Sequence, residues 1–292
     1  VFVSPDKNEF TKLVTDYGID EHSLNSSLDP DEISRLEFED NYIAMILKRP
    51  KNYSSDDKLL FKVTSIGIFL FKDKLIIVMP EDIQILEGKH NLKITNLNDI
   101  LLRLLYGTIS HFLGHLKVIN MMSDSLEQKI NSSMENKYLI NMFTLEKSLV
   151  YYLNGIGSNG LLFEKIKVNM TKFHFTEQQY GLLEEIIIEN NQCNKQAEIY
   201  SNILTGLMDA RGSIVNNNLN LLMKSLTIIS VVFMPLNVLA GMGGMSEFSM
   251  MTKDIDWRIS YSIFGLGMLI IAFVTYFLLK FFLKGKEKKS KN

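Results

Sequence analysis

The sequence has very little cysteine, since Cys193 is the only one among 292 residues. A single thiol excludes an intramolecular disulfide framework and any zinc or iron–sulfur site that needs several cysteines. The sequence also lacks a Gly-x-x-x-x-Gly-Lys-Ser/Thr phosphate loop and any evident grouping of serine, histidine and carboxylate. It therefore offers no machinery for nucleotide hydrolysis or nucleophilic catalysis, and we predict that the protein is not an enzyme.

An excess of charge of either sign is also absent, because 31 basic and 33 acidic side chains leave a net charge of −2. This balance argues against the basic surface of a nucleic-acid-binding protein, so no nucleic-acid partner is expected. The distribution is uneven: residues 225–292 hold 8 basic and 4 acidic side chains, and the rest of the chain is acidic. The two parts are suited to different surroundings.

Two stretches contain no charged residue, residues 225–246 (22 residues) and 259–279 (21 residues). A helix rises 1.5 Å per residue, so roughly 20 apolar residues cross a hydrocarbon core about 30 Å thick. We predict two transmembrane helices at these positions and the lipid bilayer as a partner. The alternative is a pair of helices buried in a soluble core, which rarely lack charge over two such lengths.

The lysines beside the second stretch predict the orientation. Cytoplasmic flanks of membrane spans are enriched in lysine and arginine. The segment 280–292 has one acidic residue, Glu287, against six lysines: Lys280, Lys284, Lys286, Lys288, Lys289 and Lys291. We therefore expect a multi-pass protein of the cell (inner) membrane with both termini cytoplasmic and an outer loop, residues 247–258, of net charge −1. No basic region leads into an apolar segment after Val1, so no signal peptide is expected.

Residues 1–174 read as a cytoplasmic α/β domain. Apolar spacing predicts helices at 5–17, 97–130 and 137–153, the last ending at Gly155, Gly157 and Gly160. Apolar runs predict strands at 42–47, 59–63 and 65–71, and a tight turn through Lys72 and Asp73 leads into a further strand.

A cytoplasmic stalk helix is predicted for residues 175–224. Thr176 and Gln179 have the spacing of a capping box, and Phe175 can pack on Tyr180. No proline follows until Pro235, so 65 residues from Glu177 to Gly241 would form a nearly continuous helix about 98 Å long. Such a helix needs partners along its length.

One face of this helix carries a mostly polar strip at alternating steps of four and three residues. Its members are Asp209, Ser213, Asn216, Asn220, Met223, Thr227, Ser230, Met234 and Asn237. Coiled-coil cores use leucine or isoleucine at such positions. The strip either joins neighbouring helices through polar contacts or lines a water-filled axis between several copies, and we favour the axis.

The segments 221–229, 233–236 and 240–241 resemble the first membrane helix of the CorA metal-ion transporters, and the likeness extends over essentially the whole chain. The resemblance implies a CorA-like funnel-shaped homopentamer, with an α/β domain, a stalk helix, a pore built from the first span (225–246) and an outer ring from the second (259–279). It also implies passive transport of divalent cations, Mg²⁺ foremost, driven by the membrane potential.

The family's Tyr-Gly-Met-Asn signature is altered here to Gly243-Gly244-Met245-Ser246. The resemblance places the outer mouth at Gly244, Met245 and Ser246, with the neighbouring Glu247 as a source of cation attraction. Because serine replaces the family's asparagine, two alternatives remain open: a Zn²⁺, Co²⁺ or Ni²⁺ transporter with an altered filter, and a non-conducting membrane scaffold or metal sensor.

Asp209 matches an intracellular metal-binding aspartate of the family, which implies a regulatory Mg²⁺ site that closes the pore. Co²⁺, Ni²⁺ or Zn²⁺ could also occupy it, and the alternative is a solvated carboxylate. The resemblance implies a partner carboxylate from the α/β domain of the adjacent subunit. The sequence offers five candidates for it: Asp29, Asp31, Glu32, Glu39 and Asp40.

His111 and His115 lie four residues apart, on one face of a predicted helix, as a two-histidine metal site requires. No Glu-x-x-His motif accompanies them. We therefore interpret them as ordinary helix histidines.

Overall fold

The computed structural model describes residues 1–53, 59–82, 94–132 and 136–289, and the side chains of all of these except 131–132, 247–249 and 282–289. The chain divides into two compact units, Val1–Asp209 and Ala210–Asn292. Each unit is considered by itself.

The first unit contains a five-stranded sheet in the order β1-β5-β4-β3-β2. Its strands are β1 (Phe2–Val3), β2 (Arg35–Phe38), β3 (Tyr42–Pro50), β4 (Val63–Phe71) and β5 (Leu75–Met79). The four strands β2 to β5 are antiparallel to their neighbours, with Met45 opposite Ile68 and Ile68 opposite Ile77, whereas β1 lies parallel to β5.

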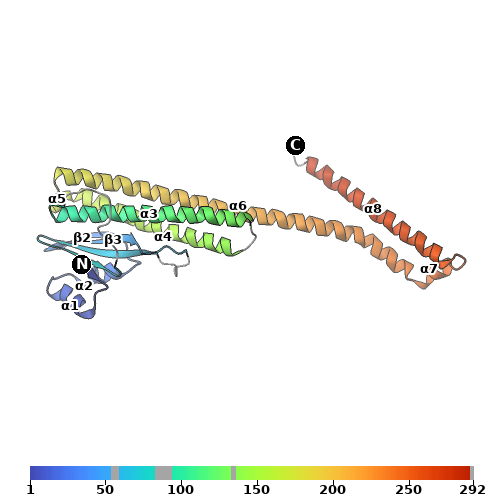
Figure 1. The fold of residues 1–292 in the computed structure, drawn as a ribbon, viewed down its shortest axis with the longest axis horizontal. Coiled ribbons are helices and arrows are strands. Elements are labelled where there is room, and N and C mark those ends of the chain that lie inside the picture. The colour runs from blue at the N-terminus through green and yellow to red at the C-terminus, as the bar shows by residue number, and fades with distance from the viewer. Residues whose placement is uncertain (54–58, 83–93, 133–135, 290–292) are drawn as a thin grey trace. The chain divides into compact units, whose positions relative to one another are not determined.

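Helices cover both faces of this sheet (Figure 1). They are α1 (Lys7–Thr15), α2 (Glu21–Leu28), α3 (Leu97–Ser132), α4 (Asn136–Val168), α5 (Met170–Phe173) and the part of α6 (Glu177–Gly243) that precedes Ala210. Because side chains alternate along a strand, Met45 and Ile68 join the core formed with α3, α4 and α6, while Ala44 and Phe69 pack against α1 and α2. The predicted α/β domain is confirmed.

The start of α6 agrees with its sequence signal. The Gln179 side chain accepts a hydrogen bond from the Thr176 backbone at 3.0 Å, and the Thr176 hydroxyl accepts one from the Gln179 backbone at 3.3 Å. The Gln179 amide also donates to Asp99 Oδ1 at 2.6 Å, which joins the beginnings of α3 and α6. Burial tends to raise the pKa of Asp99, but hydrogen bonds from Thr95, Gln179 and Asn96 outweigh it and lower the pKa.

Two expectations about the first unit are wrong. Residues 59–62 are not a strand, because the Phe61 backbone donates to the Ser148 hydroxyl at 2.9 Å instead of pairing in the sheet, and β4 begins at Val63. Helix α4 does not end at its glycines and continues to Val168. Gly155 allows α4 to approach Val63 and Phe112 closely, so it serves packing and not termination.

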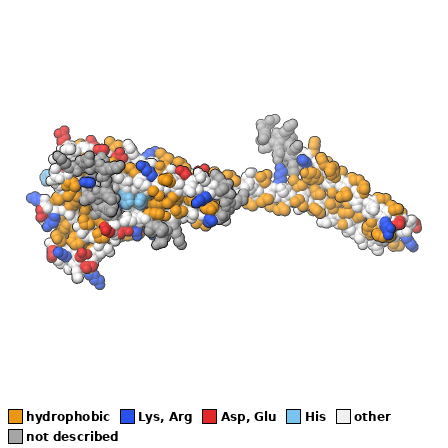
Figure 2. All heavy atoms as spheres, viewed as in Figure 1, with side chains coloured by type: hydrophobic (Ala, Val, Ile, Leu, Met, Phe, Trp, Pro, Cys, Tyr) orange, Lys and Arg blue, Asp and Glu red, His pale blue; other side chains and the backbone are white. Residues whose placement is uncertain are grey.

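The second unit consists of the end of α6, the short helix α7 (Ser246–Met251) and α8 (Trp257–Lys289). Two of its described segments, the end of α6 and residues Trp257–Phe281 of α8, are long and apolar enough to cross a membrane. Only 6% and 0% of their most apolar windows are buried within the chain. Figure 2 shows hydrophobic side chains over much of the visible surface of this unit. The alternative of two helices buried in a soluble core therefore fails for these segments.

Candidate functional site

The polar strip of the second unit lies on the exposed surface of α6. Ser213, Asn216, Asn220, Met223, Thr227, Ser230, Met234 and Asn237 are all solvent-accessible in the single chain. Alternating steps of four and three follow a 3.5-residue period, so the strip drifts by about 20° per heptad around a straight helix. Helices that wrap around one another with a left-handed twist keep such a strip facing one axis.

The hydroxyls and the amides of the strip differ in whether they find a hydrogen-bond partner within the chain. The Thr227 hydroxyl donates to the Met223 carbonyl of its own helix at 2.8 Å, so it needs no other partner in a membrane. The Asn220 and Asn237 amides have no hydrogen-bond partner within the described part of the chain. An amide at membrane depth requires water or another subunit.

The end of α6 carries the altered signature. The Gly244 backbone donates to the Ala240 carbonyl at 3.1 Å, and the Met245 backbone donates to the Met242 carbonyl at 3.2 Å. Gly243 is buried, whereas Gly244, Met245 and Ser246 are exposed and lead into α7. The backbone of Glu247 belongs to α7, but its side chain lies outside the described residues. No pattern in the sequence predicted α7, which lies in the expected outer loop.

Asp209 lies on α6 at the end of the first unit, with an exposed side chain. Carboxylate oxygens are ligands that Mg²⁺ accepts, but one carboxylate does not make a site by itself. Within the described residues, no group of three or more His, Cys, Asp or Glu side chains could hold a metal ion. The described residues of one chain therefore do not surround Asp209 with an acidic metal site.

The candidate partners near the start of β2 lie in an anchored loop. The Lys48 ammonium donates to the Pro30 carbonyl at 2.7 Å and to the Ser65 hydroxyl at 2.9 Å. Burial lowers the pKa of Lys48. The negative charges of Asp29, Asp31 and Glu32 raise it, but by less than burial lowers it. Glu32 itself contacts Arg35 at 3.4 Å.

Both this loop and α6 contact α4, and these contacts show which part of α6 lies level with the loop. The Ser34 backbone donates to the Ser158 hydroxyl at 2.6 Å, and on the same helix the Ile156 carbonyl accepts from Asn190 of α6 at 3.1 Å. Asn190 precedes Asp209 by 19 residues, about 28 Å of helix. The loop therefore does not lie at the level of Asp209.

The remaining candidates, Glu39 and Asp40, lie further away along the helix. They line a cavity of about 840 Å³ together with Asn96 and His174. The Asn96 side chain accepts from Gln179 at 3.0 Å, which places this cavity at the start of α6. Of the two groups, the loop before β2 is the nearer to Asp209 along α6.

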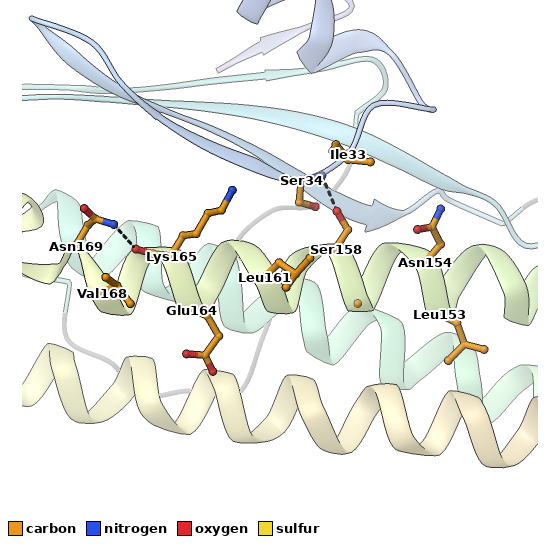
Figure 3. Close-up of a pocket in the computed structure, with 11 residues that line it drawn as sticks. Ile33, Ser34, Leu153, Asn154, Ser158, Leu161, Glu164, Lys165, Val168 and Asn169 are labelled. Carbon is orange, nitrogen blue, oxygen red and sulfur yellow. Dashed lines mark hydrogen bonds between the residues drawn. The ribbon is translucent and has the colours of Figure 1, made fainter.

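A groove of about 640 Å³ runs between α4 and the start of β2 (Figure 3). Ile33, Leu161 and Val168 on its walls are strongly exposed and apolar. The only carboxylate in its lining, Glu164, points away toward α6 (Figure 3). No carboxylate of its lining points into the groove, so we assign no ion to it.

His111 and His115 form a structural pair. Their rings meet edge to face with centroids 4.5 Å apart, Arg49 Nε donates to His111 Nδ1 at 3.3 Å, and His115 Nδ1 lies 2.6 Å from the Tyr152 hydroxyl. Burial, with the charges of His115 and Arg49, lowers the pKa of His111 to about 3. Because Nδ1 accepts from Arg49, the proton of neutral His111 resides on Nε2, which is then no metal ligand.

Acid is expected to destabilise the protein through this pair. Below about pH 6.5 the unfolded chain protonates His111, whereas the folded chain does not until about pH 3, so stability falls as the pH drops through this window. His111→Gln, which keeps an acceptor for Arg49, should reduce the fall. Thermal unfolding of the purified protein at pH 7.5 and pH 5 checks this, and an unchanged pH dependence in the variant would contradict it.

The comparison with known proteins decides the family. The family described as CorA-like Mg²⁺ transporter protein matches residues 1–281. The chain belongs to this family. The family is one of transporters and not of enzymes, and its function together with the two exposed apolar helices makes this chain a membrane protein.

Curated CorA relatives extend the match. The cobalt/magnesium transport protein CorA of Methanocaldococcus jannaschii is 24% identical over 251 residues, covering 83% of this chain and 77% of the relative. The protein of the same name from Thermotoga maritima is 23% identical over 269 residues, covering 89% and 76%. The predicted CorA resemblance is confirmed.

Solved structures show the same fold. The CorA magnesium transporter of Methanocaldococcus jannaschii superimposes with a TM-score of 0.79 at 19% identity, covering 94% of this chain and 87% of that one. The full-length CmaX protein gives a TM-score of 0.68 at 12% identity, covering 95% and 86%. The predicted arrangement of α/β domain, long helix and two apolar helices is therefore correct.

Proposed function

We propose that this chain forms a homopentameric channel that conducts Mg²⁺ and Co²⁺ passively across the membrane. The observation that carries the proposal is the pair of Asn220 and Asn237 amides, which are exposed on an apolar helix and have no partner in the described part of the chain. Five strips around a common axis would give these amides water and would give a hydrated cation polar contacts along its path.

The choice of ion rests on hydration chemistry and on the relatives. Mg²⁺ releases water reluctantly, so uncharged amides and hydroxyls that bond to its hydration shell suit it better than a cage of carboxylates. Both curated relatives are named cobalt/magnesium transport proteins. The membrane potential supplies enough energy, because two charges crossing 100 mV gain roughly 4.6 kcal/mol.

The ends of α8 support the proposed position in the membrane. The Arg258 guanidinium lies 5.5 Å from the Trp257 ring centroid, and Lys280 Nζ lies 5.8 Å from that of Tyr276. Aromatic and basic residues favour the two membrane interfaces. Trp257 and Tyr276 are 19 residues apart, about 28 Å of helix, which matches the hydrocarbon thickness. With the lysine-rich tail inside, both termini are cytoplasmic.

Regulation by cytoplasmic metal is the further part of the proposal. The Asp209 carboxylate would hold Mg²⁺ together with oxygen ligands of an adjacent subunit and so tie the subunits in the closed arrangement. Its exposed position on α6 leaves it accessible to a neighbouring copy.

Flux in reconstituted vesicles tests the proposal directly. With a potential negative inside, Mg²⁺ and Co²⁺ should enter and accumulate, and native mass spectrometry of the same sample should show five copies. Ni²⁺ and Zn²⁺ measured in parallel distinguish an altered filter. If no divalent ion crosses and the chain is monomeric in mild detergent, the non-conducting scaffold becomes the better interpretation.

The mouth can be tested by two substitutions. Glu247→Gln should raise the half-saturating concentration of every divalent ion, because five carboxylates near the axis attract cations through a field that salt screens within about 10 Å at 0.1 M. Ser246→Asn should sharpen the preference for Mg²⁺ by offering an amide to the hydrated ion. Uptake of Mg²⁺ and Co²⁺ at low and high ionic strength measures both effects, and the assigned mouth is wrong if neither variant differs from the parent.

A further inference from the structure

Gly243 lies at the last position of α6 and is buried against the ring of Phe264 on α8. A Cβ at this position would lie 2.7 Å from Cζ and 2.9 Å from Cε1 of that ring. Real Cβ atoms essentially never lie within 3.0 Å of another heavy atom, so either the ring or the backbone at 243 would have to shift. The ring edge thus occupies the space that any other residue at 243 would need.

Other glycines of the same unit do not make such a contact. A Cβ added at Gly241, Gly265 or Gly267 would meet nothing within 4 Å. Ser260, one turn before Phe264 on α8, is also buried, at 7% exposure. Among these glycines, Gly243 alone lies against a ring of α8.

The contact lies directly before the proposed mouth. After Gly243 the backbone turns through the bonds from Gly244 to Ala240 and from Met245 to Met242, and Ser246 begins α7. The Phe264 ring therefore determines how closely the end of α6 approaches α8, and so where the exposed residues that follow are placed.

We propose that Phe264 is a positioning residue for the outer mouth, acting through Gly243 on the placement of Gly244, Met245 and Ser246. This inference rests on the proposed function, because it assigns an effect on ion capture to the contact. Ordinary van der Waals contact begins at 3.4 Å, so a Cβ at 243 reaches ordinary contact with the ring only after a displacement of about 0.7 Å. A shift of this size is enough to misplace groups that bond to a hydrated ion.

A rescue experiment tests this proposal. Gly243→Ala should raise the half-saturating Mg²⁺ concentration at least tenfold and change the ratio of Mg²⁺ to Co²⁺ uptake, while the pentamer yield stays the same. The double variant Gly243→Ala with Phe264→Ala lacks the ring. Its half-saturating Mg²⁺ concentration should lie within threefold of that of Phe264→Ala alone. Gly265→Ala, where a Cβ has room, is the matched control and should behave as the parent.

A readout that does not depend on transport separates this inference from the proposed function. Ser246→Cys provides one exposed thiol, since Cys193 is buried, and a water-soluble maleimide should modify it. Gly243→Ala should change that modification rate at least threefold, and Phe264→Ala should restore it. Absence of Mg²⁺ flux in the parent would overturn the proposed function, while the thiol rates would still test the contact. If Gly243→Ala matches Gly265→Ala in both readouts, or changes only the yield, the positioning role is wrong.

Discussion

Replacing Asn237 by leucine is expected to slow Mg²⁺ uptake by roughly 70-fold. In the proposed pentamer five Asn237 amides face the axis, and each offers a hydrogen bond to the water around the passing ion. Losing five such bonds at about 0.5 kcal/mol each raises the barrier by about 2.5 kcal/mol. Leucine also dries this level of the pore, which adds to the barrier. Initial uptake rates into vesicles at an imposed potential measure the effect.

The adjacent residue supplies the control. Val238 is 61% exposed and lies about 100° further round the helix, so Val238→Leu adds one methylene on a face away from the proposed axis and should leave uptake within twofold of the parent. Cysteine at each position tests the same geometry without transport. A small water-soluble thiol reagent should modify Asn237→Cys and spare Val238→Cys, and the reverse result would show that the strip faces lipid.

The polar strip could be predicted because it depends on local periodicity alone. A capping box at Thr176 and the absence of proline up to Pro235 define one long helix, and a period of 3.5 residues then places Asn220 and Asn237 on one face. No tertiary contact is needed for either step. The same holds for the turn at Lys72 and Asp73, where the Phe71 backbone donates to the Lys74 carbonyl at 2.9 Å.

The wrong expectations concern residues whose role depends on packing. Glycine at 155 resembles a helix terminator in sequence, but in the fold it accommodates Val63 and Phe112, which are distant in the chain. The contact of Gly243 with Phe264 is of the same kind, since 21 residues separate the two and no periodicity connects them. Close approaches between elements are fixed by tertiary packing, which overrides the local preference of glycine.

The proposed role of Asp209 could not be completed from the sequence, because the resemblance places its partner ligand on another subunit. A rotation axis keeps equivalent residues at equal heights, so a neighbour can offer only residues at the level of Asp209 when α6 runs along that axis. The loop before β2 lies at the level of Asn190, about 28 Å away along the helix. In such an arrangement the loop before β2 would not reach Asp209 of a neighbour.

Removing the Asp209 carboxylate should leave the channel conducting at millimolar internal Mg²⁺, where the parent is expected to be closed. A ligand at ten times its dissociation constant stabilises the state that binds it by about 1.4 kcal/mol per site, so five sites contribute about 7 kcal/mol. A change of about 5.5 kcal/mol is enough to move the equilibrium between open and closed states from 1:99 to 99:1, so five sites suffice. Asp209→Ala removes this entire stabilisation of the closed state by bound metal. Mg²⁺ uptake by the variant at 5 mM internal Mg²⁺ should therefore exceed that of the parent at least tenfold.

The comparison with neutral and remote variants separates metal binding from a general loosening of the stalk. Asp209→Asn keeps the shape of the side chain and removes its charge, so it should behave as Asp209→Ala if the carboxylate binds metal. Glu198→Ala removes another exposed carboxylate of α6, one that already pairs with Lys195 at 2.7 Å, and should remain inhibited like the parent. Vesicles loaded with 0 to 10 mM Mg²⁺ give the inhibition curve for each variant. Equal inhibition of Asp209→Ala and the parent would place the closing site elsewhere, whereas relief by Glu198→Ala as well would point to stalk charge in general.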